Sequence, residues 1–381
     1  TEVIVHLYEE EGEACVESLR GMFAFAVWDR KNETCFLARD RLGIKPLYYA
    51  PLGGRLVFGS EIKALREAPD LPRDVDPQAL ADYMTYLWIP APKSIFRQIR
   101  KLPPGHTAMF DREGLRLRRS WDREDFEPLT FDRGTMVDRF RELLGEAVRL
   151  RLVSDVELGA FLSGGLDSSA VVATMASLVD RPVRTHSIGF DEREFSEIPY
   201  SDKVARQFGT EHHRHTVTPD AVDVVGRLAW FYDEPFADSS AVPTYYVSEC
   251  ARRHVTVALS GDGGDENLAG YRKYKFNERL RGVRRRVPGP LRRGVFGTLG
   301  RIYPKADWLP RMLRARQTFQ ELAGSDLEAI YLSRAVVHPA VSSRLLNSAL
   351  REQLADYDPV SVIEEHYHRC RADSPLNREL Y

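Results

Sequence analysis

The sequence predicts an α/β protein that begins with an antiparallel sheet region and continues as a doubly wound parallel sheet. Short apolar runs separated by turns follow one another over residues 22–59, which is the pattern of an antiparallel sheet. From about residue 135, helical and strand-like runs alternate as far as Leu259, which is the pattern of βαβ units. A length of 381 residues suits two domains, each with its own core.

The N-terminal domain, residues 1–125, is expected to open with a helix over residues 1–20. Strands are expected at the apolar runs Met22–Trp28, Cys35–Ala38, Leu47–Ala50 and Leu56–Gly59. Gly53 and Gly54 separate the last two runs and predict a hairpin turn, because glycine adopts the positive φ that such turns need. The polar stretch Trp121–Pro128 is the expected linker.

The second domain, residues 135–381, is expected to begin with a helix, because apolar residues from Val137 to Val148 recur at helical spacing. A strand over Val156–Leu162, a helix over Ala170–Val179 and a strand over Pro182–Phe190 then complete a βαβ unit. The same reading places a further strand at Val255–Leu259.

The loop between the first of these strands and its helix has the composition of a phosphate-binding loop. It contains Ser163, Gly164, Gly165, Asp167, Ser168 and Ser169. Glycines let backbone N–H groups approach phosphate oxygens, and a helix N-terminus adds further donors. An acid in such a loop predicts Mg²⁺ between the carboxylate and the phosphates. The alternative is a serine-capped strand–turn–helix junction without a ligand.

A second loop, Ser260–Glu266, also follows an apolar strand and combines serine, glycines and acids. Two such loops suit a parallel sheet whose ligand lies beyond the carboxyl ends of the strands. A solvated acidic turn or a calcium loop is the alternative, although the ligand spacing of an EF-hand is lacking. Neither loop has the Gly-Lys-Ser/Thr ending of a Walker A loop or the GxGxxG pattern of a dinucleotide loop.

The composition predicts no nucleic-acid or membrane partner. Lys and Arg number 54 against 56 Asp and Glu, so no global field favours either surface. No apolar run is long enough to span a bilayer. The scattered cysteines, without a CxxC pair, predict free thiols and a cytoplasmic location.

For two further clusters of basic residues and histidines, we favour a structural role over ligand binding. The arginine-rich run Arg279–Arg293 is interrupted by prolines and lacks interleaved aromatics, which favours a solvated or domain-facing surface over nucleic acid. His212, His213 and His215 lie beside a strand-like run, so exposed strand-edge histidines are favoured over a metal site.

Several separate stretches together resemble the glutamine-hydrolysing asparagine synthetases of the bacterial B type. They occur in family order over about the first 275 residues: Arg20–Ala26, Ala38–Tyr49, Gly59–Leu65, Lys101–His106, the loop at 163–169, Asp233–Asp238 and the loop at 260–266. The resemblance implies an N-terminal-nucleophile (Ntn) glutaminase sheet joined to an ATP pyrophosphatase domain. It also implies an activity: aspartate is activated as β-aspartyl-AMP with release of pyrophosphate, and ammonia derived from glutamine displaces AMP.

The resemblance also implies roles for individual residues. Pyrophosphate and Mg²⁺ would be bound by Ser163, Gly164, Gly165, Asp167, Ser168 and Ser169, and Asp265 would join Asp167 on the metal. Leu162 and Ile188 would contact adenine and ribose, and Ser260 and Gly261 would contact ATP. Asp262 would take the catalytic position tied to forming the adenylate. Glu234 and Asp238 are weaker candidates for the substrate or ammonia path, and a helix-capping acidic loop explains them equally well.

Both ends of the chain depart from the family pattern. The family's nucleophile is an N-terminal cysteine, whereas this chain begins Thr1-Glu2-Val3 and its first cysteine is Cys15. It ends at Tyr381 before the family's Lys-Val-Asp-Arg stretch. We therefore expect an internal fragment of a longer protein, without the glutaminase nucleophile. Amination of another carboxylate, as in surface-polysaccharide or β-lactam-forming relatives, and a non-catalytic ATP-binding fragment are the alternatives. The sequence does not decide the oligomeric state, and a homodimer stays open.

Overall fold

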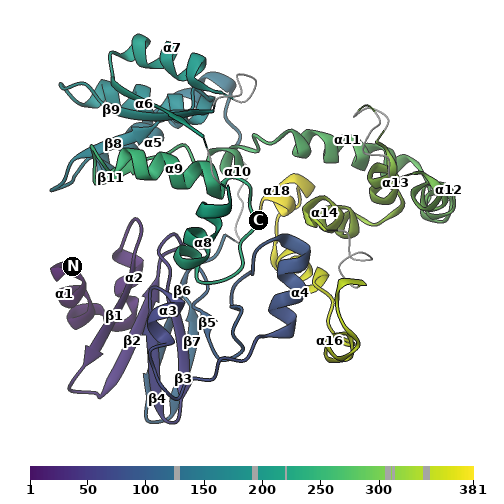
Figure 1. The fold of residues 1–381 in the computed structure, drawn as a ribbon, viewed down its shortest axis with the longest axis horizontal. Coiled ribbons are helices and arrows are strands. Elements are labelled where there is room, and N and C mark those ends of the chain that lie inside the picture. The colour runs from purple at the N-terminus through teal and green to yellow at the C-terminus, as the bar shows by residue number, and fades with distance from the viewer. Residues whose placement is uncertain (124–128, 191–195, 219–220, 305–309, 311–313, 338–343) are drawn as a thin grey trace.

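The computed structural model describes the chain apart from residues 124–128, 191–195, 219–220, 305–309, 311–313 and 338–343. Figure 1 shows the purple and blue N-terminal sheets below, the teal parallel sheet above them, and the green and yellow helices to one side. The combination of antiparallel sheets in the N-terminal part with a parallel sheet farther on confirms the predicted fold class.

The N-terminal part contains two antiparallel sheets. One has the order β1-β2-β6-β7 and the other the order β4-β3-β5. The strands are β1 (Ala24–Asp29), β2 (Thr34–Arg39), β3 (Tyr48–Leu52), β4 (Arg55–Gly59), β5 (Arg100–Lys101), β6 (His106–Asp111) and β7 (Gly114–Arg119). Leu37, Tyr49 and Leu102 join them through one buried cluster. The expected hairpin turn is present, with φ of 54° at Gly53 and 80° at Gly54.

Helices of the N-terminal part pack against its sheets through buried side chains. They are α1 (Glu2–Glu11), a 3₁₀ turn at Gly12–Ala14, α2 (Cys15–Ser18), α3 (Ile62–Leu65) and α4 (Pro77–Tyr86). Cys15 and Phe36 are fully buried in the cluster between α2 and the first sheet. The carboxylate of Asp76 caps α4 by accepting from the backbone N–H of Gln78, with a nitrogen–oxygen distance of 2.9 Å.

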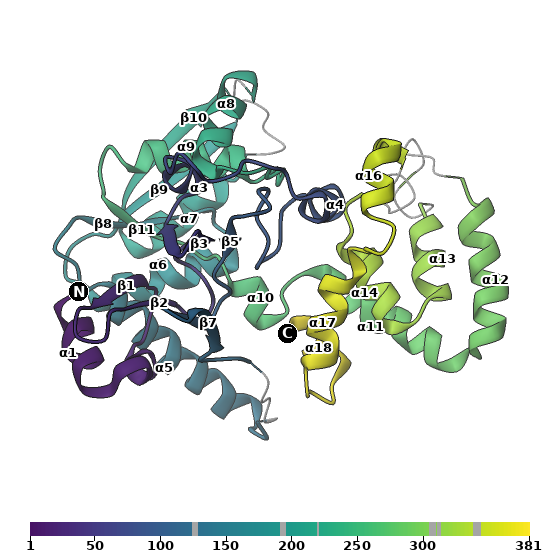
Figure 2. The same cartoon turned by 90° about the horizontal axis from the view of Figure 1, so that it is seen from below.

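The central parallel sheet has the strand order β10-β9-β8-β11. Its strands are β8 (Leu158–Phe161), β9 (Arg184–Phe190), β10 (Glu211–Val217) and β11 (Val257–Leu259). Its helices are α5 (Arg133–Arg151), α6 (Leu166–Leu178), α7 (Ile198–Phe208), α8 (Ala221–Tyr232) and α9 (Ala241–Ala251). Figures 1 and 2 place α9 on one face of this sheet and α6 and α7 on the other. A cluster that includes Leu162, Val172 and Met175 forms the core beneath α6.

Helices make up the rest of the described chain. They are α10 (Gly264–Leu268), α11 (Arg272–Arg286), α12 (Gly289–Ile302), α13 (Arg316–Ala323), α14 (Asp326–Arg334), α16 (Ser348–Gln353), α17 (Val360–Arg369) and α18 (Pro375–Leu380). Within the arginine-rich run, Arg281 and Arg284 are buried rather than solvated, and Arg284 Nη2 lies 2.7 Å from Asp326 Oδ1. Neither arginine is solvated, and their partners Asp326 and Glu379 lie on α14 and α18 of the same helical part.

The connection between α8 and α9 joins the N-terminal sheets to the parallel-sheet part. Lys63 Nζ lies 2.9 Å from Asp233 Oδ1, and Lys101 forms an ion pair with Glu234. Glu234 also accepts from the backbone N–H of Ile95 at 3.2 Å. Burial raises the pKa of Glu234 and lowers that of Lys101, with the opposite charge of each partner acting against this effect.

The structure changes some of the expected element bounds. β6 and β7 were not among the expected strands, and α6 begins at Leu166 rather than at Ala170. Residues 124–128 of the expected linker lie outside the described residues. Among the helices in the described part of the chain, none is both long enough and apolar enough to cross a bilayer.

Candidate functional site

Two loops that are distant in the sequence meet at the carboxyl ends of the strands of the parallel sheet. β8 and β11 are hydrogen-bonded neighbours, and Leu259 of β11 pairs with Ala160 of β8. The chain leaves β8 toward β9 on one side and returns as β11 on the other, so the two loops flank a topological switch point. Such a point is where open α/β sheets bind ligands.

The first loop leads directly into the N-terminus of α6. Gly164 has a φ of +82°, and a Cβ at this position would lie 2.6 Å from the backbone nitrogen of Ser201. Only glycine satisfies both the left-handed backbone and this close approach. Because α6 begins at Leu166, Asp167, Ser168 and Ser169 lie on its first turn, where unpaired N–H groups favour an anion.

The serine hydroxyls of this loop differ in what they contact. Ser163 Oγ lies 2.9 Å from Ser168 Oγ and accepts from the N–H of Gly165 at 3.1 Å. Within the described residues, the buried Oγ of Ser169 has no hydrogen-bond partner. A buried polar atom without a partner is costly, so a ligand oxygen at Ser169 would satisfy it.

The second loop packs tightly against the first. A Cβ on Gly261 would lie 2.6 Å from the backbone nitrogen of Ser168, and one on Gly264 would lie 2.6 Å from Cγ of Asp167. Only glycine at position 261 permits this spacing, because a Cβ there would meet backbone atoms, whereas a Cβ at position 264 would displace the carboxylate of Asp167. The structure therefore brings the predicted residues Asp167, Ser168 and Gly261 into one site.

The carboxylates of the site repel one another. Burial raises the pKa of Asp167, and the charges of Asp265 and Glu266 raise it further. Asp265 Oδ1 would lie 2.0 Å from a Cβ on Gly270, so the side chain of Asp265 folds back over the end of α10. A bound cation would relieve the repulsion between these acids.

The donor set fits Mg²⁺ only with phosphate as a further ligand. Among the described residues, no three His, Cys, Asp or Glu side chains come together as a metal-binding group. Mg²⁺ commonly uses one or two carboxylates together with phosphate oxygens and water. Asp167 and Asp265 are the pair that would hold it.

The remaining predicted residues lie near the same carboxyl ends in different environments. Ser260 Oγ donates to Asp262 Oδ2 at 3.0 Å, which orients the carboxylate predicted to be catalytic. Ile188 lies in β9 and is partly buried. The side chain of Leu162 is only 1% exposed and belongs to the core. The backbone N–H of Leu162 donates to the carbonyl of His186 at 2.9 Å. Its side chain therefore packs in the core, and its N–H is already hydrogen-bonded within the sheet.

The acidic segment Asp233–Asp238 contacts other groups. Glu234 pairs with Lys101 at the junction with the N-terminal sheets, rather than with either loop. Asp238 Oδ1 accepts from the N–H of Ser240 at 2.8 Å, just before α9, but α9 has no side-chain cap hydrogen bond, so this contact is not the expected helix cap. Sequence reasoning missed Tyr271, whose hydroxyl donates to Glu266 Oε1 at 2.5 Å. Its place directly after Ala269-Gly270 was the only available signal.

The three histidines of β10 differ from the expectation. β10 is an edge strand, as expected, but His212, His213 and His215 are all partly buried rather than exposed. His213 stacks on His254, with ring centroids 3.9 Å apart. The cause is the parallel register, which sets His213 beside His186 and turns its ring toward the lead-in to β11.

Comparison with known proteins finds two family profiles that match separate parts of the chain. The profile of the glutamine amidotransferase domain matches residues 1–121, and that of asparagine synthase matches residues 139–381. A Methanocaldococcus jannaschii protein assigned by name to the glutamine-hydrolyzing asparagine synthetases is 40% identical over 291 residues, covering 75% of this chain and 56% of its own. Asparagine synthetase [glutamine-hydrolyzing] 1 of Bacillus subtilis is 34% identical over 276 residues, covering 72% of this chain and 43% of its own. Amidase chyE of Penicillium rubens is 29% identical over 297 residues, covering 72% of this chain and 43% of its own.

These matches define a chain in which a glutamine amidotransferase region is followed by an asparagine synthase region. The chain belongs to the asparagine synthase family. It spans about half the length of the curated relatives that it matches.

Proposed function

We propose that this chain carries the ATP-binding site of a glutamine-dependent asparagine synthetase and activates aspartate as β-aspartyl-AMP. The observation that carries the proposal is the contact between the two loops, in which Gly261 and Gly264 pack against Ser168 and Asp167. That contact places acids directly beside a phosphate-binding helix N-terminus. The family membership supports the choice of reaction, and the predicted division into residues 1–125 and 135–381 is part of the same proposal.

Each residue of the site has a chemical task in this proposal. The N–H groups at the start of α6, with Ser163, Ser168 and Ser169, bind the β- and γ-phosphates. Asp167 and Asp265 would hold Mg²⁺, which would neutralise the charge developing on pyrophosphate. Ile188, Ser260, Gly261 and the backbone near Leu162 border the nucleoside end of ATP.

The proposed reaction balances in two steps. A carboxylate oxygen of aspartate attacks the α-phosphorus of ATP, the bond to the bridging oxygen breaks, and pyrophosphate leaves. Ammonia then attacks the acyl carbon, the C–N bond forms, AMP leaves, and the nitrogen loses a proton. Asp262, held by Ser260, is placed to act on the first step. The carboxylate needs this activation because its oxygen is otherwise a poor leaving group.

Pyrophosphate release on addition of ATP, Mg²⁺, aspartate and ammonium tests the function. We expect release by the chain as it stands, and loss of at least about 100-fold in Asp167→Asn, because one oxyanion or metal contact is worth this much in related sites. Asp155→Asn is the matched control, because Asp155 is exposed and precedes the opposite end of β8.

The outcomes separate the alternatives. Release stimulated by another acid but not by aspartate would overturn the substrate assignment in favour of a related amidotransferase. ATP binding without release under any condition would identify a non-catalytic binding chain. Unchanged ATP affinity in Asp167→Asn would refute the assignment of the loop itself.

A further inference from the structure

Four histidines form a cluster on the face of the parallel sheet that α9 covers, away from the proposed ATP loops. His186 comes from β9, His213 and His215 come from β10, and His254 lies just before β11. The parallel register pairs His213 directly with His186, so the two rings lie side by side. The rings of these two residues are nearly parallel, with centroids 5.1 Å apart and an angle of 12° between planes.

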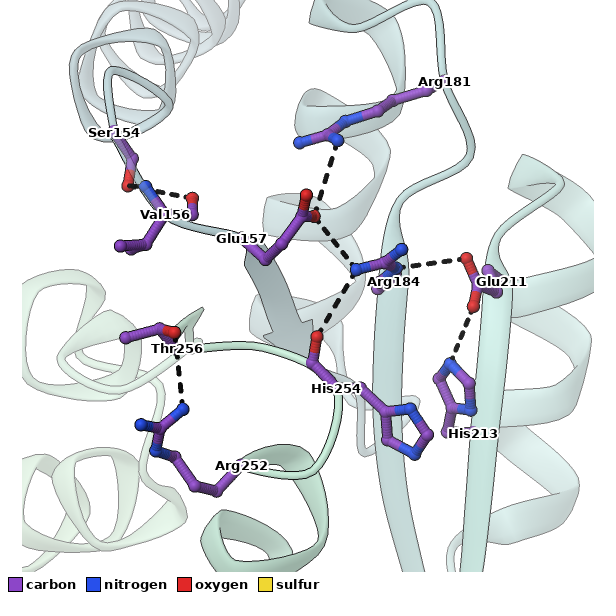
Figure 3. A network of polar contacts seen from close by, with 10 residues as sticks. All are labelled: Ser154, Val156, Glu157, Arg181, Arg184, Glu211, His213, Arg252, His254 and Thr256. Atoms are coloured by element: carbon purple, nitrogen blue, oxygen red, sulfur yellow. Dashed lines mark hydrogen bonds and ion pairs between the residues drawn. The ribbon is translucent and has the colours of Figure 1, made fainter.

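His254 completes the stack from a different part of the chain. Its ring lies 3.9 Å from that of His213, with 19° between the planes, and 5.5 Å from that of His186. His215 lies at its edge, 6.3 Å from His254. Figure 3 shows His213 and His254 side by side beneath a network of charged groups at the start of the strands. We call His186, His213, His215 and His254 the histidine stack.

Two members of the stack, His186 and His215, are in surroundings that favour the neutral ring. His186 is fully buried, and neither of its ring nitrogens has a hydrogen-bond partner among the described residues. Burial, together with the neighbouring His213 and His254, lowers the pKa of His186 to about 4. Burial also lowers the pKa of His215, with Arg253 and His254 adding to this effect. Protonation would place like charges on rings in van der Waals contact.

Charged groups surround the stack on each element that packs against it. They are Arg184 of β9, Glu211, His212 and Arg214 of β10, Glu157 before β8, Glu249 of α9, Arg252 and Arg253 after α9, and Asp202 of α7 on the other face. Glu211 Oε1 lies 3.1 Å from His213 Nε2, and its other oxygen lies 3.3 Å from Arg184 Nε. Glu157 is also engaged by Arg184, at 3.0 Å (Figure 3). The acids nearest the stack are therefore already shared with arginine, and only His213 has a carboxylate at its ring.

The stack also holds the segment that leads to the second loop. His254 contacts β9 and β10 through its ring, and its carbonyl accepts from Arg184 Nη1 at 3.4 Å. β11 follows at Val257 and carries Ser260, Gly261 and Asp262 at its end. β11 spans only Val257–Leu259 and pairs with β8, so the ring of His254 links its lead-in to β9 and β10.

We propose that the histidine stack is a pH-sensitive clamp, which fixes the lead-in to β11 while its rings are neutral and releases it when they are protonated in mild acid. A histidine whose folded pKa is depressed contributes stability that is complete above its unfolded pKa. That stability is lost as the pH falls from about 6.5 toward the folded value, by about tenfold in the folding equilibrium per pH unit for one such ring. Release of this lead-in would also loosen the second loop and weaken nucleotide binding, and this consequence rests on the proposed function.

The test is the thermal midpoint of the full chain between pH 5 and pH 8, together with hydrogen exchange of residues 250–262 corrected for the intrinsic pH dependence. We expect the wild type to lose stability below pH 6.5 and to expose residues 250–262 at pH 5.5. His186→Phe removes the ring whose pKa is depressed, and His254→Phe removes a ring that lowers the pKa of His186 and His215. Both variants keep an aromatic ring, and their midpoints should change with pH by less than half as much. His6→Phe is the control, since the side chain of His6 is 65% exposed on α1.

Every outcome bears on the clamp. If wild type and both variants share one pH dependence, or if residues 250–262 stay protected at pH 5.5, the proposal is wrong. If His186→Phe does not fold, the exposed position His254 decides alone. A failure to bind ATP at every pH, with acid opening of residues 250–262 intact, would refute the proposed function and leave the clamp standing.

Discussion

Replacing Gly261 by alanine tests whether the two loops form one site. The added Cβ would lie 2.6 Å from the backbone nitrogen of Ser168 and 3.0 Å from the carbonyl carbon of Asp167. These are backbone atoms on the first turn of α6, so no side-chain rotation relieves the contact. The loops must move apart by several tenths of an ångström or more, and overpacking of this kind costs about 1–3 kcal/mol.

The expected result for Gly261→Ala is a lower thermal midpoint and weaker ATP binding. At about 2–4 °C per kcal/mol, the midpoint should fall by about 2–12 °C. Titration calorimetry with Mg-ATP should show a loss of at least about tenfold in affinity, because the backbone groups at α6 and the second loop no longer face one ligand together.

Gly145→Ala is the matched control for this substitution. Gly145 lies inside α5, where a Cβ would meet no atom within 4 Å, so alanine there should stabilise the chain by about 0.5–1 kcal/mol. If Gly261→Ala left both the midpoint and the ATP affinity unchanged, the packing of the two loops would be refuted, and the proposed site with it.

Two further substitutions test the N-terminal part and its junction. Lys101→Met should destabilise the chain by about 3–5 kcal/mol, because the Glu234 carboxylate, 10% exposed, would lose its cation, and the double variant Lys101→Met/Glu234→Leu should recover most of that loss. Calorimetric midpoints of the two singles and the double would show it, and additive effects would contradict a direct pairing. Asp76→Ala removes the cap of α4 and should cost about 1 kcal/mol, whereas Asp74→Ala, at an exposed position, should change the midpoint little. Equal midpoints for these two variants would show that the cap contributes nothing.

The strand–loop–helix around Ser163 was predictable because its signals are local. The apolar run before Ser163, the glycines and the apolar run after Ser169 each have a meaning independent of the rest of the chain. The prediction placed the start of this helix too late, because Leu166-Asp167-Ser168-Ser169 has no apolar periodicity of its own. An acid and serines at a helix N-terminus are nevertheless stabilised by the unpaired N–H groups there.

Other parts of the fold depend on partners that no local pattern reveals. β7 has the sequence Gly-Leu-Arg-Leu-Arg-Arg and pairs with β6. Because half of its residues are arginines, a search for apolar runs does not detect it as a strand. The role of Glu234 follows from Lys101, which is remote in the sequence. The histidine stack depends on the parallel register between His213 and His186 and on the turn that delivers His254. Parallel pairing is set by tertiary packing, so sequence spacing alone does not predict these contacts.

The strand order β10-β9-β8-β11 has a consequence for how the protein is made. The first loop is synthesised early in the parallel-sheet part, but its neighbour β11 follows only after β9, β10 and the helices between them. Contacts between segments so distant in the chain close slowly, because their loop-closure entropy must be offset first. A growing chain therefore displays Ser163–Ser169 before Ser260–Glu266 exists. If the proposed site binds nucleotide, the nucleotide can help to fold this part of the chain only after Asp265 has been synthesised.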